Sequence, residues 1–180
     1  MIDKFDQFVA TQIESLGDGG SGLNIEQEKE IWLKKLNELY SLVNKSLSDH
    51  ISKNNIVVEY EDINLTEELL GTYSVKMALI KVGQHKVKLQ PIGTFLIGAR
   101  GRVDMIGPRG TTRFTIVPPA AIAPQVRVTI FLPGENPHTP EQIATPETWV
   151  WKIATPPPRI TYIDLNNETF REALMGVISG

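Results

Sequence analysis

The fold is decided by residues 72–82, which read Thr-Tyr-Ser-Val-Lys-Met-Ala-Leu-Ile-Lys-Val. Larger apolar side chains recur at every second position of this stretch, at Tyr73, Val75, Met77 and Leu79. Side chains of a β-strand point alternately to its two sides, so a period of two predicts one long strand with a solvated face. This strand is the centre from which the rest of the chain can be interpreted.

Shorter runs of the same kind lie on both sides of it. We expect strands at residues 56–61, 86–89, 92–97, 102–106, 112–117, 126–132, 148–153 and 160–165. Pro91 requires a bulge or an edge position, because proline cannot donate a backbone hydrogen bond. Turn residues separate these runs and no helical pattern intervenes, which indicates a meander of antiparallel strands and argues against a parallel sheet.

Helical periodicity is confined to the two ends of the chain. Apolar residues spaced by three and four predict helices over residues 2–16, 24–53 and 167–178, and glycines make residues 17–22 a flexible joint. We therefore predict an α+β protein with about 7–8 mainly antiparallel strands, as a meander or a partly closed barrel or sandwich. A two-helix N-terminal arm (residues 1–54) precedes a sheet domain (residues 55–180) that ends in a helix.

The helix over residues 24–53 allows two interpretations. Its apolar stripe can pack across the chain's own sheet, which is the usual role of such a stripe. Alternatively, the two N-terminal helices form a hairpin that contacts a partner chain or a second copy. The residues that would make this contact are Phe5, Val9, Trp32, Leu36, Leu39 and Val43.

Charge is distributed unevenly along the chain. Residues 1–75 carry 6 basic and 14 acidic side chains, whereas residues 76–113 carry 8 basic side chains and the single acid Asp104. The basic segment is a candidate site for a polyanion such as nucleic acid. Its candidate residues are Lys76, Lys86, Lys88, Arg100, Arg102, Arg109 and Arg113. The sequence pI of about 5.7 argues against this role. A simpler alternative is that the acidic helices lie against the basic sheet.

Two arginines of this segment belong to a short repeat, Ile97-Gly-Ala-Arg-Gly101 and Ile106-Gly-Pro-Arg-Gly110. Glycines between strands usually mark turns, so we interpret both copies as hairpin turns. Successive turns of a meander lie at opposite ends of its strands. We therefore expect Arg100 and Arg109 to lie far apart rather than to converge on one phosphate.

The chain lacks the usual motifs of catalysis and cofactor binding. It has no cysteine, so disulfides, thiol nucleophiles and cysteine metal sites are excluded. His50, His85 and His138 are scattered and predicted to lie at the surface, and no phosphate-binding or metal-binding spacing occurs. We predict no cofactor and no metal. Without an apolar signal core or a membrane-length run, we expect a cytoplasmic location and no membrane partner.

Two further residue patterns each have a structural and a functional interpretation. Trp149 and Trp151 share one face of a strand, where they could stack bases but are more simply anchors of the core. Asp104 could be a nuclease-type acid, but pairing with Arg102 or Arg113 is the simpler expectation.

These observations support three functions in decreasing order. The first is a non-catalytic interaction or assembly protein that acts on another chain or on itself through its arm and sheet. The second is nucleic-acid binding through residues 76–113, and the third is an enzyme with an unrecognised site.

Overall fold

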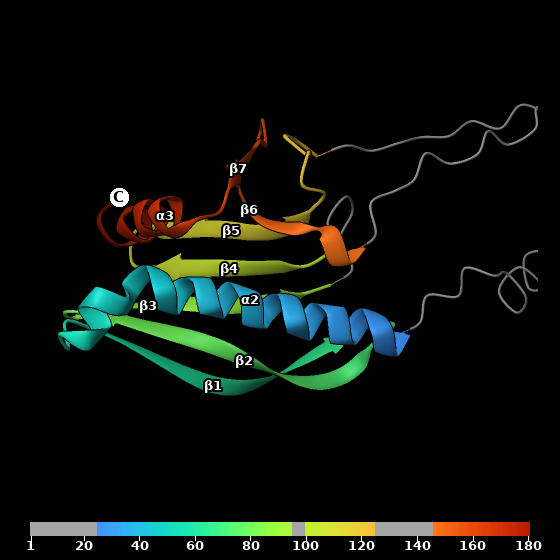
Figure 1. The fold of residues 1–180 in the computed structure, drawn as a ribbon, viewed down its shortest axis with the longest axis horizontal. Coiled ribbons are helices and arrows are strands. Elements are labelled where there is room, and N and C mark those ends of the chain that lie inside the picture. Colours follow the sequence, from blue (N-terminus) through green and yellow to red (C-terminus); the bar gives the residue numbers. More distant parts are fainter. Residues whose placement is uncertain (1–24, 95–99, 125–145) are drawn as a thin grey trace, which may run out of the picture.

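The computed structural model describes residues 25–94, 100–124 and 146–180 and places them in one antiparallel sheet with two helices (Figure 1). The elements in chain order are α2 (Ile25–Ser52), β1 (Ile56–Glu67), β2 (Gly71–Val82), β3 (His85–Gly93), β4 (Arg102–Gly107), β5 (Gly110–Val117), the short 3₁₀ helix η1 (Pro146–Thr148), β6 (Val150–Ala154), β7 (Tyr162–Asp164) and α3 (Asn167–Ser179).

The sheet is a meander in which spatial order equals chain order, from β1 to β7. Every neighbouring pair is antiparallel. The predicted α+β class, the mainly antiparallel sheet and the terminal helix are confirmed. Within the described residues the sheet is open, with β1 and β7 as its edges. The strand predicted at residues 126–132 lies outside the described residues.

The helix predicted over residues 24–53 is α2, and it packs across its own sheet. Figure 1 shows it running diagonally over the strands. Its apolar stripe is buried in a core with the inner side chains of the sheet, and consists of Trp32, Leu36, Leu39, Val43 and Leu47. One helix thus precedes the sheet in the described chain, and the two-helix arm is not matched, since residues 2–16 and the joint at 17–22 lie outside the described part. The division into an arm and a sheet domain at residue 54 stays a prediction.

The second helix, α3, lies on the same side of the sheet as α2. The Arg171 Nε donates to the Ser46 carbonyl over 2.7 Å, and the Phe170 ring packs 6.1 Å from the Phe114 ring, centroid to centroid. α3 is capped by Asn166, whose side chain accepts from the backbone of Glu168 and Thr169. Both helices therefore cover one face of the sheet.

The β1–β2 hairpin departs from the simple alternation that the sequence suggests. Tyr73 and Val75 belong to the core under α2. Ala78 and Ile80 belong to it as well, although alternation would make them point to the opposite side of the strand. The register with β1 is continuous, so no inserted residue explains the change. The hairpin twists between Val75 and Ala78, and in Figure 1 its two strands cross in projection. The prediction of a single solvated face along residues 72–82 is wrong for this reason.

Of the two alternatives predicted for Pro91, a bulge or an edge position, β3 has the irregular register of a bulge. The register between β3 and β4 shifts between Pro91 and Gly93. The Glu67 carboxylate holds this irregular end of the strand by accepting from the backbone N–H of Thr94 over 2.8 Å and from its hydroxyl over 3.0 Å. Glycine is favoured at position 93 because its φ of +144° is strained for residues with a Cβ.

Candidate functional site

The face of the sheet opposite the helices, here called the open face, is the main surface that the two helices leave uncovered. In β3 to β6 the core under the helices receives alternate residues, among them Leu89, Met105, Phe114 and Ile153. The residues between them point to the open face because strand side chains alternate. They include Lys86, Lys88, Gln90, Arg102, Asp104, Ile106, Thr111, Arg113, Thr115, Val150, Lys152 and Ala154.

One end of the open face is covered by the segment that follows β5. The Lys152 Nζ donates to the Ala121 carbonyl over 3.1 Å, and the Tyr162 N–H donates to the Ile122 carbonyl over 2.9 Å. Lys152 is accordingly buried, at 5% exposure. The covered end lies over β6, so the exposed part of the open face extends over β2 to β5.

Three ion pairs neutralise much of the charge on the open face. Lys81 pairs with Glu59 over 2.7 Å and Lys152 with Asp164 over 2.9 Å. The third is the most enclosed, because the Arg102 guanidinium donates to both oxygens of Asp104, each over 2.7 Å. This hydrogen bonding raises the pKa of Arg102 against the opposing effect of burial. The expectation that Asp104 pairs with Arg102 or Arg113 is confirmed for Arg102.

Three cations of the open face remain without such compensation. Among the described residues, the charged ends of Lys86, Lys88 and Arg113 have no ion-pair or hydrogen-bond partner. Lys88 lies directly opposite Ile106 across the β3–β4 pair, and the Ile106 side chain is 40% exposed. The open face thus combines uncompensated positive charge with exposed apolar surface.

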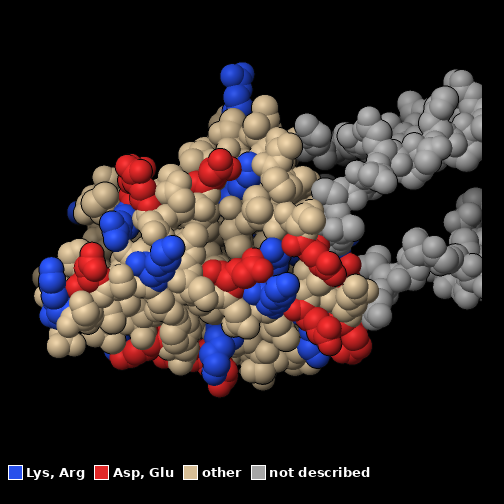
Figure 2. Space-filling model, in the orientation of Figure 1, with Lys and Arg blue, Asp and Glu red and all other residues tan. Residues whose placement is uncertain are grey.

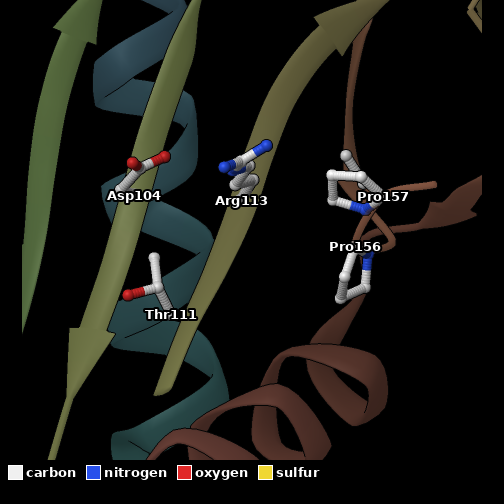
Figure 3. A pocket seen from close by; sticks show the side chains of 6 residues that line it. Asp104, Thr111, Arg113, Pro156 and Pro157 are labelled. Atoms are coloured by element: carbon white, nitrogen blue, oxygen red, sulfur yellow. The ribbon is translucent and has the colours of Figure 1, made fainter. Parts of the chain in front are cut away.

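A hollow of about 280 Å³ lies on the open face beside Arg113 (Figure 3). Its lining residues are Asp104, Thr111, Arg113, Ala154, Pro156 and Pro157. Figure 3 shows Asp104, Thr111 and Arg113 on the side of the strands away from α2, and the two prolines across the hollow from them. Strand pairing places Asp104 and Ala154 directly on either side of Arg113.

The candidate polyanion-binding residues are not brought together on one surface. Lys86, Lys88, Arg102 and Arg113 share the open face. Lys76 instead pairs with Asp62 over 2.7 Å, and Arg100 pairs with both oxygens of Glu28 on α2, over 2.6 and 2.7 Å.

Arg109 lies far from Arg100, as expected. It occupies the β4–β5 turn, where its backbone N–H donates to Val177 of α3, whereas Arg100 precedes the other end of β4. The interpretation of both repeats as hairpin turns applies to the second copy, since most of the first lies outside the described residues. Glu28 and Arg100 form the single described ion pair between α2 and the sheet region. The expected contact between acidic helices and a basic sheet is represented by this pair alone.

The candidate partner-binding residues of α2 are enclosed by the chain itself. Trp32, Leu36, Leu39 and Val43 have exposures of 1%, 3%, 1% and 0%. While α2 is packed on the sheet, these side chains are not accessible to a partner. Phe5 and Val9 lie outside the described residues, and their role stays a prediction.

The surface on the helix side shows no concentration of one charge. Figure 2 views the molecule from this side, and basic and acidic side chains are interspersed across it. Trp151 lies beneath this surface, where its indole N–H donates to the Lys35 carbonyl over 2.7 Å and its ring packs 6.2 Å from that of Trp32. The interpretation of Trp151 as a core anchor is therefore confirmed. Trp149 stacks at 5.4 Å under the Arg100 guanidinium.

The described residues contain no group of three or more histidine, aspartate or glutamate side chains with the geometry of a metal site. His50 and His85 are exposed, as predicted, and His138 lies outside the described part. Neither α2 nor α3 combines the length and the apolar character that a membrane crossing needs.

Sequence reasoning identified Arg113 but missed the hollow around it. The wall formed by Pro156 and Pro157 comes from a segment far along the chain, and no local pattern connects it with β5. The alternation of β5 could have indicated that Thr111 and Arg113 share a face.

Comparisons with protein-family models, with curated proteins and with solved structures found no match to this chain.

Proposed function

We propose that this chain is a non-catalytic interaction protein whose open sheet face docks an acidic surface of a partner protein. The observation that carries the proposal is the contrast between the two faces. Both helices cover one face, while the other presents Lys86, Lys88 and Arg113 without compensating acids among the described residues. Complementary charge steers association and selects the partner.

The open face also supplies the apolar contact that a stable interface needs. Ile106 is 40% exposed and lies directly opposite the uncompensated Lys88 across the β3–β4 pair. Protein interfaces usually combine an apolar centre with a polar rim. We place Ile106 near the centre of the docking surface and the three cations around it.

A protein partner fits this surface better than nucleic acid. Single-stranded nucleic acid binds to sheets by stacking its bases on exposed aromatic side chains. Among the described residues of β3 to β6, none on the open face is aromatic, and Tyr162 of β7 lies at the end that the segment after β5 covers.

The proposal can be tested by site-specific photo-crosslinking in cells of the source organism. A photoreactive residue at Ile106 reports on the open face, and one at the exposed Asn37 reports on the outer side of α2. We expect one identified protein to crosslink at Ile106 and not at Asn37, through a segment rich in aspartate or glutamate.

A matched pair of charge-reversed variants makes this test specific. The variant K86E/K88E/R113E should abolish the crosslink at Ile106. The variant K34E/K45E/K53E makes the same change of net charge at exposed residues of α2 and the turn after it, and should leave the crosslink intact. An equal loss in both variants, or a crosslink only from Asn37, would overturn the proposal. If an oligonucleotide added at low salt competes with the partner and removes the crosslink at Ile106, nucleic-acid binding would be favoured instead.

A further inference from the structure

We propose that the hollow beside Arg113 is a carboxylate pocket that accepts one acidic side chain of the partner. This inference rests on the proposed function for the identity of the ligand, but the pocket itself can be tested without a partner. It assigns a binding role to Arg113 and Thr111, and a shaping role to the Pro156–Pro157 segment.

The first argument is the state of the Arg113 guanidinium. Asp104 is its direct cross-strand neighbour, and an acid in that position would normally compensate an arginine. Both oxygens of Asp104 instead accept from Arg102, and one carboxylate cannot neutralise two arginines. The positive charge of Arg113 is therefore available, although the residue is only partly exposed.

The second argument is the chemistry of the walls. Thr111 lies two residues before Arg113 on the same face of β5 and adds a hydroxyl that can donate. Pro156 and Pro157 contribute apolar rings and a restricted backbone to the opposite side of the hollow. This wall partly shields the Arg113 guanidinium from water on one side, which strengthens a hydrogen bond to an anion.

The third argument is size. A volume of about 280 Å³ lies just below the range of pockets that hold drug-sized molecules. It accommodates a carboxylate with a short aliphatic stem, as in glutamate. A planar carboxylate also matches the two parallel N–H groups of the guanidinium better than a single-atom anion does.

The pocket can be tested on the full chain by following the arginine Nε–Hε signals in NMR spectra. Sodium propionate serves as a probe for the glutamate side chain, with sodium chloride and inorganic phosphate at matched ionic strength as comparisons. We expect propionate to shift the Arg113 signal in a saturable manner while the Arg102 signal stays in place. Chloride should cause no saturable shift.

Variants of the lining residues make the assignment specific. R113K keeps the charge but loses the planar fork, and should weaken propionate binding roughly tenfold or more. T111V removes the hydroxyl at nearly constant shape and should weaken binding by a smaller factor. R109K changes an arginine in the turn outside the hollow and should leave binding unchanged.

Each contrary outcome has a defined meaning. Propionate binding that survives R113K, a shift of Arg102 in place of Arg113, or saturation by phosphate but not by propionate would overturn the carboxylate pocket. If propionate binds as expected while the crosslink at Ile106 persists in K86E/K88E/R113E, the pocket stands and the proposed protein docking fails. An acidic partner peptide that displaces propionate would support both.

Discussion

The two faces of the sheet use the same strands for opposite purposes. On the helix side, residues such as Phe114 and Val103 are fully buried and hold two helices. On the open face, their immediate chain neighbours Arg113, Arg102 and Asp104 carry charge. The residues that stabilise the fold therefore lie on one side of each strand, and the residues of the proposed docking surface lie on the other. A change on one face should leave the property of the other face largely intact.

The largest test of this separation compares two adjacent residues of β5. Phe114→Ala removes a ring with 0% exposure that packs on Phe170, and should lower the free energy of unfolding by about 3–5 kcal/mol. Arg113→Ala should change it by no more than about 0.5 kcal/mol, because its side chain has no described partner. Urea unfolding followed by tryptophan fluorescence measures both values. Similar losses in the two variants would contradict the division between faces.

An intermediate effect is expected where α3 meets the sheet. A Cβ added at Gly107 would lie 2.4 Å from the Val177 carbonyl oxygen, so Gly107→Ala must displace α3. We expect a loss of about 1–3 kcal/mol, typical of overpacking. Gly110 pairs with Gly107 across the hairpin and has nothing within 4 Å of an added Cβ, which makes Gly110→Ala the matched control. Thermal unfolding should separate the two variants, and equal midpoints would show that the α3 contact is not close.

The smallest effect depends on pH and compares tyrosines of the two faces. Burial, with a contribution from Tyr60, raises the pKa of Tyr40 well above its usual value near 10. Above about pH 10 the unfolded chain loses a proton that the folded protein retains, so stability should fall as pH rises, by at most about 1.4 kcal/mol per pH unit for this group. Burial raises the pKa of Tyr162, on the open side, to a smaller extent.

Unfolding measured from about pH 9 to about pH 11 tests whether Tyr40 contributes more than Tyr162 to the loss of stability with rising pH. Tyr40→Phe should flatten the decline with pH more than Tyr162→Phe does. Tyr40→Phe also removes the hydrogen bond to the Lys76 carbonyl, so the slope with pH is compared and not the absolute stability. A slope that is unchanged by Tyr40→Phe would show that this hydroxyl is not protected from solvent.

Local patterns were sufficient to predict most of the fold because one face of the sheet is buried and the other is polar. α2 was predicted over 24–53 and spans Ile25–Ser52, and α3 was predicted over 167–178 and spans Asn167–Ser179. β1 was expected to end at residue 61 but continues to Glu67. The buried residues of β1 switch from one side of the strand to the other where the hairpin twists. A strict alternation of apolar and polar residues therefore does not predict the second half of the strand.

The site was less predictable than the fold. The count of basic residues in 76–113 was informative, but the role of each depends on its partner across the sheet. Arg100 and Lys76 are compensated by acids from α2 and β1, and Arg102 by Asp104 on its own strand. The surroundings of Arg113 depend on which residues lie opposite it in the sheet and on Pro156 and Pro157, more than 40 residues later in the chain. Neither can be inferred from the sequence around Arg113.

The meander order has a consequence for how the chain folds. Several strand pairs join through turns of a few residues, at 68–70, 83–84 and 108–109, so their ends meet at little cost in loop entropy. Topologies with many local contacts fold faster than those that rely on distant ones. During synthesis α2 leaves the ribosome before any strand that covers its apolar stripe. β1, β2 and β3 follow it directly, but Trp151, which packs on Trp32, and α3 come much later in the chain, so part of the stripe stays open to the aggregation that threatens partly folded proteins until these segments have been made.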